Sequence, residues 1–233
     1  MTDASAGRPA DLYPVAHSGG PVGAVGFDLD MTLIDSRPGI AAAYRALSAQ
    51  TGVPIDAELA VTRLGPPLRT EIREWFPPEQ VEEAVTTYRA LYPAYAIEPT
   101  GPTPGAVAAV TAVRALGLRV VVVTSKLGRL AELHLAHLGL PYDELAGDLF
   151  AEGKAAALTE HGVRWYVGDH TGDMVAARTA GIPGIGVATG PCSAADLRTA
   201  GASYVLSDLT GLPALLREIT VGSRPGTLDS LES

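Results

Sequence analysis

Short apolar runs alternate with longer segments of helical spacing along most of the chain. Such runs are typical of strands that are buried on both faces of a parallel sheet. We expect strands at 22–28, 119–124, 163–168, 183–188 and 203–206. Helices are predicted in the gaps, notably at 104–116, 127–138, 153–161 and 172–180. This alternation predicts an α/β fold with a doubly wound, mainly parallel, Rossmann-like sheet.

A helical segment interrupts this alternation between Ser36 and Thr103. Apolar residues recur at helical spacing through 39–52 and are followed by a glycine stop. The segment 77–96 begins with prolines and has acidic residues in its first turn, which is typical of a helix start. We therefore expect a small helical unit inserted into the α/β core.

These patterns divide the chain into four parts. The core is predicted to comprise 22–36 and 101–220, and the inserted helical unit 37–100. The first segment, 1–21, is rich in Gly, Pro, Ser and Ala, and together with 221–233 it is expected to form flexible tails.

Two aspartates follow the first strand. Asp28 and Asp30 are separated by one residue, so their side chains leave an extended backbone in roughly the same direction. Two carboxylates at one strand end can bind a cation, or divide the roles of nucleophile and proton carrier. Turn hydrogen bonds to nearby backbone are the alternative interpretation of this pair alone.

Three more polar clusters weaken that alternative. Thr124 and Ser125 end the second predicted strand, Lys154 lies at the start of an alanine-rich helix, and Asp169 and Asp173 follow the third strand. In open parallel sheets the ligand crevice lies beyond the carboxyl ends of the strands. All four clusters are therefore expected to line one crevice.

Several other motifs do not fit. An EF-hand loop starting at Asp28 fails at its glycine and glutamate positions, which hold Leu33 and Gly39. The glycines before Lys154 have the wrong spacing for a nucleotide P-loop, and GIGVAT at 184–189 lacks the third glycine of a dinucleotide fingerprint. His134 and His137 can share a helix face, but no third metal ligand is near them in sequence.

Composition limits the class of protein. The net charge of −9 argues against nucleic acid as the main ligand, and no apolar run approaches the ~20 residues of a membrane helix. The N-terminal segment lacks the basic start and apolar stretch of a secretory signal. Cys192 is the single cysteine, which excludes an internal disulfide and is compatible with a cytoplasmic enzyme. The net charge does not argue against a small phosphorylated metabolite as substrate, because a bound Mg²⁺ can reverse the potential of an acidic pocket. We expect no membrane partner, and either a monomer or a homodimer.

Through these residues the sequence resembles the haloacid dehalogenase (HAD) superfamily, specifically its phosphoglycolate phosphatase-like branch with a helical cap. DLDMTL is similar to the first family motif, TS at 124–125 to the second, Lys154 to the third and GDHTGD to the fourth. The resemblance covers 22 to about 212. It implies that the first strand lies between those carrying the second and fourth motifs, and that the inserted helices form the cap.

The resemblance also implies a mechanism. Asp28 would attack phosphorus to form an aspartyl phosphate, and Asp30 would act as general acid and then base. Thr124 and Ser125 would bind the phosphate, and Lys154 would supply positive charge to it. Mg²⁺ would be held by Asp28, the backbone carbonyl of Asp30 and Asp169, with Asp173 nearby. Asp30 would have to be neutral in the first step.

Two positions depart from the family pattern. Met31 stands where glycine is usual, a change that is tolerable if its backbone keeps an ordinary conformation. Ala155 replaces the common proline after Lys154. Lys126 is the only other lysine in the chain that could take the role of Lys154.

Substrate choice is expected to depend on the cap. The segment 63–75 resembles the family's cap loop, and Arg63 or Arg69 is predicted to bind a second anionic group of the substrate. A phosphomutase of the β-phosphoglucomutase type and a non-catalytic phosphate-binding regulator stay open as alternatives. Asp30 argues against hydrolytic dehalogenation, because that branch of the superfamily lacks this aspartate.

Overall fold

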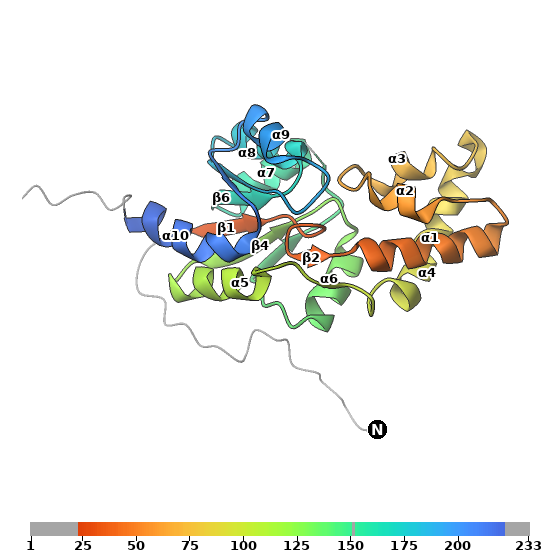
Figure 1. Cartoon of the computed structure of the whole chain (residues 1–233), viewed down its shortest axis with the longest axis horizontal. Coiled ribbons are helices and arrows are strands. Elements are labelled where there is room, and N and C mark those ends of the chain that lie inside the picture. Colours follow the sequence, from red (N-terminus) through yellow and green to blue (C-terminus); the bar gives the residue numbers. More distant parts are fainter. Residues whose placement is uncertain (1–22, 151, 222–233) are drawn as a thin grey trace, which may run out of the picture.

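The computed structural model describes residues 23–150 and 152–221, and it has an α/β core beside a separate helical region (Figure 1). Six strands form one sheet in the order β5-β4-β1-β6-β7-β8, and each neighbouring pair is parallel. The strands are β1 (Ala24–Phe27), β4 (Arg119–Val123), β5 (Glu144–Ala146), β6 (Val163–Gly168), β7 (Gly184–Val187) and β8 (Tyr204–Leu206). The predicted doubly wound α/β fold is confirmed, and β5 is an addition to the predicted strands.

The strand side chains are apolar on both faces of the sheet, so helices cover both faces. In β4, Val120 and Val122 pack with one core cluster, whereas Val121 and Val123 pack with the other. Residues of α5, α6 and α10 contribute to the first cluster, and residues of α7 and α8 to the second. The helices are α5 (Ala106–Ala115), α6 (Gly128–His137), α7 (Glu152–Glu160), α8 (Thr171–Thr179), α9 (Ala194–Thr199) and α10 (Leu212–Val221), with the short η3 (Leu209–Gly211) before the last.

The helical region lies between β2 (Ile34–Asp35) and β3 (Gly101–Pro102), which pair antiparallel and connect it to the core. It comprises α1 (Arg37–Thr51), α2 (Ala57–Val61), α3 (Leu68–Ile72), η2 (Pro78–Gln80) and α4 (Val81–Tyr95). Its own apolar cluster includes Tyr44, Leu47, Ile72, Phe76 and Tyr88. The helices predicted within 39–52 and 77–96 are therefore present, and Figure 1 shows them on the right, beside the carboxyl ends of β1 and β4.

The predicted tails, 1–21 and 221–233, lie outside the described residues except for residue 221, which ends α10. In the described part of the chain, no helix combines the length and apolar character needed to cross a membrane.

Candidate active site

The loop after β1 makes a tight turn that presents Asp28 and Asp30. The backbone N–H of Asp28 still donates to Val167 O of β6, and three later N–H groups of the turn donate to Leu29 O. Met31 has φ of 61°, so the condition that it keeps an ordinary conformation is not met. Its N–H donates to Ile34 O and its carbonyl accepts from Thr189 Oγ1 at 2.6 Å. These contacts hold Met31 in the left-handed region that glycine usually occupies.

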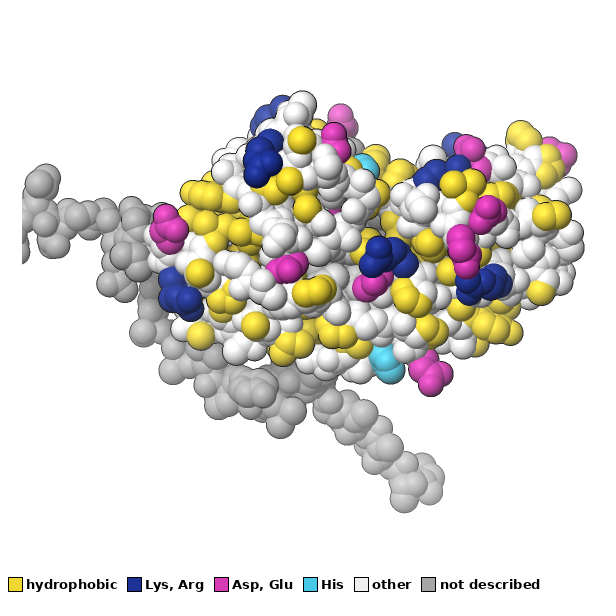
Figure 2. All heavy atoms as spheres, in the orientation of Figure 1, with side chains coloured by type: hydrophobic (Ala, Val, Ile, Leu, Met, Phe, Trp, Pro, Cys, Tyr) yellow, Lys and Arg dark blue, Asp and Glu magenta, His cyan; other side chains and the backbone are white. Residues whose placement is uncertain are grey.

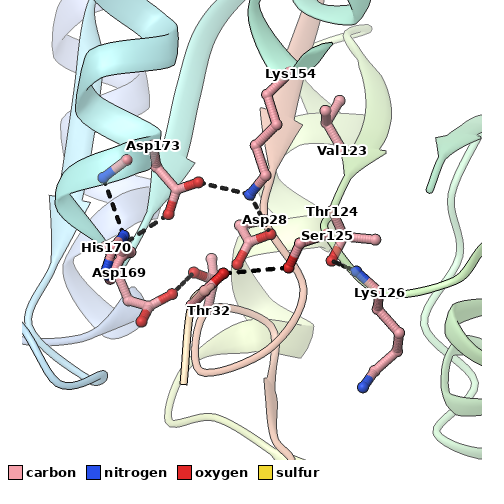
Figure 3. A network of polar contacts seen from close by, with 12 residues as sticks. Asp28, Thr32, Val123, Thr124, Ser125, Lys126, Lys154, Asp169, His170 and Asp173 are labelled. Atoms are coloured by element: carbon pink, nitrogen blue, oxygen red, sulfur yellow. Dashed lines mark hydrogen bonds and ion pairs between the residues drawn. The ribbon is translucent and has the colours of Figure 1, made fainter. Parts of the chain in front are cut away.

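Lys154 connects the first and fourth motifs. Its Nζ donates to Asp28 Oδ1 at 2.8 Å and to Asp173 Oδ1 at 2.7 Å. Figure 3 shows the Lys154 side chain reaching from α7 to a point between these two carboxylates. Burial lowers the pKa of Lys154, but the charges of Asp173 and Asp28 outweigh it and hold the pKa well above its usual value. The ammonium group is therefore charged at neutral pH.

Neighbouring side chains fix the other two aspartates of this cluster. Thr32 Oγ1 donates to Asp169 Oδ1 at 2.8 Å. Asp173 accepts from Tyr166 OH at 3.2 Å and, through Oδ2, from the backbone N–H of His170 at 3.1 Å. The His170 side chain accepts from Gly172 N–H and caps α8. Each carboxylate consequently has a defined orientation at the carboxyl end of the sheet.

Asp28, Asp169 and Asp173 form a cluster of three carboxylates, and the ammonium group of Lys154 beside them balances only one negative charge. Each offers an oxygen atom within 4.8 Å of the others, and all three are buried. Burial raises the pKa of Asp28 to about 7, although the Lys154 charge opposes this shift. Burial and then the charges of Asp28 and Asp173 raise the pKa of Asp169 well above its usual value. Three hard oxygen donors with one nearby ammonium group fit a divalent cation such as Mg²⁺.

The backbone at Gly190 passes very close to the Asp169 carboxylate. A Cβ atom on Gly190 would lie 1.8 Å from Asp169 Oδ2, so only glycine allows the chain to pass this carboxylate. Gly168 similarly faces the Asp173 side chain, which would lie 2.4 Å from an added Cβ. The loop after β7 and the end of β6 therefore define the space that the carboxylates occupy.

Asp30 has a different partner. Lys126 Nζ lies 3.0 Å from Asp30 Oδ1 and also donates to Tyr92 OH at 2.8 Å. In Figure 3 the Lys126 side chain points away from Lys154 and Asp28. Burial raises the pKa of Asp30, but the Lys126 charge and hydrogen bonding lower it below its usual value overall. Asp30 is therefore ionised in this conformation, whereas the first chemical step was predicted to need its neutral form.

Thr124 and Ser125 lie at the end of β4 as the sequence predicts. Thr124 is fully buried, and its Oγ1 accepts from Lys126 N–H at 3.2 Å. Ser125 lines a cavity between the core and the helical region, which we call the main cavity. Its Oγ donates a long hydrogen bond of 3.4 Å to Gly65 O in the helical region. The second motif thus faces both the core and the helical region.

A cavity of about 290 Å³ extends from Asp28 and Asp30 between the core and the helical region. Arg63 and Arg69 line it, but each already forms an ion pair, with Glu71 and Glu82 respectively. Their predicted role in binding a substrate anion stays a prediction.

Sequence reasoning missed Thr32, Tyr166 and the partners of Lys126. Thr32 is part of the DLDMTL segment, so its distance from Asp28 was a usable signal. Tyr166 lies inside an apolar strand, where a tyrosine is ordinarily explained by packing alone. Tyr92 lies in the helical region, and no local pattern relates it to Lys126.

Comparison with known sequences agrees with the family resemblance of the sequence motifs. The family model of the haloacid dehalogenase-like hydrolases matches residues 25–178, and a second HAD-like model matches 154–212. The phosphoglycolate phosphatase of Chromobacterium violaceum is 31% identical, over 83% of this chain and 96% of that protein. The tyrosine-protein kinase PtkA of Mycobacterium tuberculosis is 34% identical over 124 residues. That match includes 52% of this chain but only 43% of the kinase, so the chain spans less than half of the kinase's length.

Solved structures have the same architecture. A haloacid dehalogenase-like hydrolase from Streptococcus pneumoniae superposes with a TM-score of 0.73 at 25% identity, over 86% of this chain and 99% of that one. The similarity includes the helical region as well as the sheet, because so little of either chain is left out.

Proposed function

Because the chain belongs to the haloacid dehalogenase-like hydrolase family, we propose that it is a Mg²⁺-dependent phosphatase that hydrolyses a small phosphate monoester through a phosphoryl group on Asp28. The observation that carries the proposal is the position of Lys154 between Asp28 and Asp173, next to Asp169. This arrangement combines a carboxylate nucleophile, a fixed ammonium group and a set of oxygen donors for a cation.

Asp28 acts as the nucleophile. An anionic carboxylate attacks phosphorus slowly unless the phosphate charge is offset, because both reactants are negative. Lys154 holds Asp28 Oδ1 and brings one positive charge to the site. Asp28, Asp169 and the backbone carbonyl of Asp30, with Asp173 nearby, would hold Mg²⁺, which would supply further positive charge to the phosphate. Thr124 and Ser125 donate hydrogen bonds to the phosphate oxygens.

Asp30 moves the protons. It protonates the oxygen of the leaving alcohol and later accepts a proton from the water that attacks the phosphorylated Asp28. Asp30 lines the cavity and is not part of the Asp28, Asp169 and Asp173 cluster. Since Lys126 keeps Asp30 ionised in this conformation, protonation of Asp30 must accompany substrate binding.

A panel of phosphate monoesters tests this function. Phosphate release should require Mg²⁺, stop with EDTA and disappear in Asp28→Asn. Asp35→Asn is a matched control, because Asp35 is a partly exposed carboxylate whose side chain pairs with nearby Arg37. Turnover that persists in Asp28→Asn or in EDTA would contradict the proposal.

A further inference from the structure

The main cavity is where the alcohol part of a substrate must lie, because Asp28 and Asp30 are at one end and the helical region forms the opposite wall. Building on the proposed phosphatase function, we infer that this cavity selects phosphate monoesters whose alcohol part is uncharged. Esters with a second anionic group, such as phosphoglycolate, are disfavoured. The inference thus departs from the activity after which the phosphatase relatives are named.

The cations that line the cavity already face carboxylates. Four basic side chains line it, and each is paired: Arg63 with Glu71, Arg69 with Glu82, Arg89 with Asp148, and Lys126 with Asp30. Four acidic side chains also line it, namely Asp28, Asp30, Glu71 and Asp148. A substrate carboxylate entering this balanced set of charges finds no surplus cation among the described residues.

Arg63 has the most contacts of the three arginines in this set. Its Nε and Nη2 donate to the two oxygens of Glu71 at 3.1 and 2.6 Å. Glu71 also accepts from Trp75 Nε1 at 3.0 Å, and the Arg63 guanidinium lies 5.7 Å from the centre of the Trp75 ring. A substrate carboxylate can take this Nε and Nη2 edge of Arg63 only by displacing Glu71, whose side chain is only 13% exposed. The displaced glutamate would then remain as a like charge beside the substrate.

The pairs of Arg69 and Arg89 are more exposed than that of Arg63 on their acidic side, since Glu82 and Asp148 are 65% and 62% exposed. Arg89 Nη2 lies 3.4 Å from Asp148 Oδ1 and connects α4 to the loop after β5. Figure 2 shows positive and negative side chains lying next to one another over the helical region on the face in view. An ion pair at an exposed position contributes little binding energy. A substrate carboxylate that has to leave water would therefore gain little from contact with Arg69 or Arg89.

The inner wall is neutral. Tyr44, Tyr88 and Tyr92 form a row with ring centroids 4.7 and 5.6 Å apart. Burial raises the pKa of Tyr44 and of Tyr88 above the ordinary value, so their hydroxyls are uncharged at neutral pH. The remaining lining is largely aliphatic, with Ile40, Leu64, Leu68, Val85, Leu127 and Leu130. Such a surface accepts a neutral alcohol and offers a second anion no compensating charge.

Two isosteric substrates test the inference. Phosphoglycolate and its carboxamide have the same shape around the ester but differ in charge. With the Mg²⁺-loaded full-length enzyme, kcat/KM should be at least about tenfold higher for the carboxamide. Phenyl phosphate, whose alcohol part is uncharged and has no carbonyl group, serves as a third substrate.

A substitution at Glu71 gives the complementary test. Glu71→Gln keeps an acceptor for Trp75 but removes the charge that Arg63 faces, so Arg63 becomes available to a substrate carboxylate. We expect kcat/KM for phosphoglycolate to rise about tenfold, while the value for the carboxamide changes by less than about twofold. Glu79→Gln is the matched control, because Glu79 is exposed on η2 and does not line the cavity.

The outcomes separate this inference from the proposed function. If the carboxamide and phenyl phosphate are hydrolysed but phosphoglycolate is the better substrate, the cavity does not select against charge and only the inference is overturned. If Glu71→Gln leaves the preference of an active enzyme unchanged, the Arg63 argument is overturned. If none of the three esters is hydrolysed, the phosphatase proposal fails together with the inference that rests on it.

Discussion

The ammonium group of Lys126 lies 3.0 Å from the carboxylate of Asp30, the residue to which we assign proton transfer. The same ammonium donates to Tyr92 OH of α4, and Tyr92 OH in turn lies 3.0 Å from His134 Nε2 of α6. Asp30 is thus oriented by a chain of contacts that includes the helical region. Lys126 and Lys154, the two lysines of the protein, hold Asp30 and Asp28 respectively.

Removal of the Lys126 charge should impair catalysis without abolishing metal dependence. Lys126→Met keeps the length of the side chain but leaves the Asp30 carboxylate without its ammonium partner. We expect kcat to fall about 10–100-fold, which is less than the roughly 10²–10⁴-fold contribution of an acid–base group itself, because Asp30 is still present. Steady-state kinetics at saturating Mg²⁺ measure this. Tyr92→Phe, which removes one hydrogen bond to Lys126, should have a smaller effect, and an unchanged kcat in Lys126→Met would exclude the orienting role.

Lys154→Met should have a larger effect on turnover than Lys126→Met. Lys154 contacts Asp28 directly, and its loss removes the fixed positive charge beside the nucleophile. We expect kcat to fall about 10²–10³-fold, as when one preorganised donor is removed from a charge-stabilising site. Rapid-quench measurement of the first turnover distinguishes this loss from slow product release. Equal or smaller impairment than in Lys126→Met would reverse the assignment of the two lysines.

Gly190→Ala should weaken metal binding. An added Cβ would lie 1.8 Å from Asp169 Oδ2, so the Asp169 carboxylate must move. We expect the Mg²⁺ concentration for half-maximal activity to rise about 10–100-fold, the usual cost of disturbing the surroundings of a metal ligand. Isothermal titration with Mg²⁺ gives the affinity directly. Gly128→Ala is the control, because an added Cβ there meets no atom within 4 Å, and a normal affinity in Gly190→Ala would show that Asp169 is not a ligand.

His134 should make the protein less stable in acid. Burial, then the charge of Lys126, lowers the pKa of His134 to about 4, although Asp30 opposes this. The unfolded chain, with an ordinary histidine pKa of 6.5, binds a proton between pH 6.5 and 4 that the folded protein does not. The free energy of unfolding should therefore fall as pH falls through this window, by up to ~1.4 kcal/mol per pH unit from this group.

The measurement for His134 is a difference between two proteins. Urea unfolding of wild type and His134→Gln at pH 7.5 and pH 5 isolates this group from the other titrating residues, including Asp28 and Asp169. The variant should lose less stability over this interval than wild type does. A parallel loss in both proteins would show that His134 protonates as readily in the folded state as in the unfolded chain.

The order of apolar runs was enough to predict most of the core. Strands such as 119–123 and 163–168 are predictable, because burial on both faces of the sheet requires mostly apolar residues in a row. The short β5, Glu144–Ala146, was not predicted because three partly buried residues make no apolar run. The bounds proposed for the core and the inserted unit stay predictions.

The site was predictable where motifs fall at strand ends and less so where contacts cross between regions. Asp28, Lys154, Asp169 and Asp173 meet because the carboxyl ends of parallel strands share one edge of the sheet. The left-handed backbone of Met31 depends on Thr189, which is 158 positions away in sequence. The ionised state of Asp30 depends on the direction of the Lys126 side chain, which spacing along a strand does not specify.

The most direct test of the account is the chemical state of Asp28 during turnover. Acid quenching of the Mg²⁺-loaded enzyme with a hydrolysable monoester, followed by peptide mass spectrometry, locates any phosphoryl group. We predict one phosphoryl group on Asp28 that is absent in EDTA and in Asp28→Asn. A phosphoryl group on another residue, or burst kinetics of phosphate release with Asp28 unmodified, would contradict it.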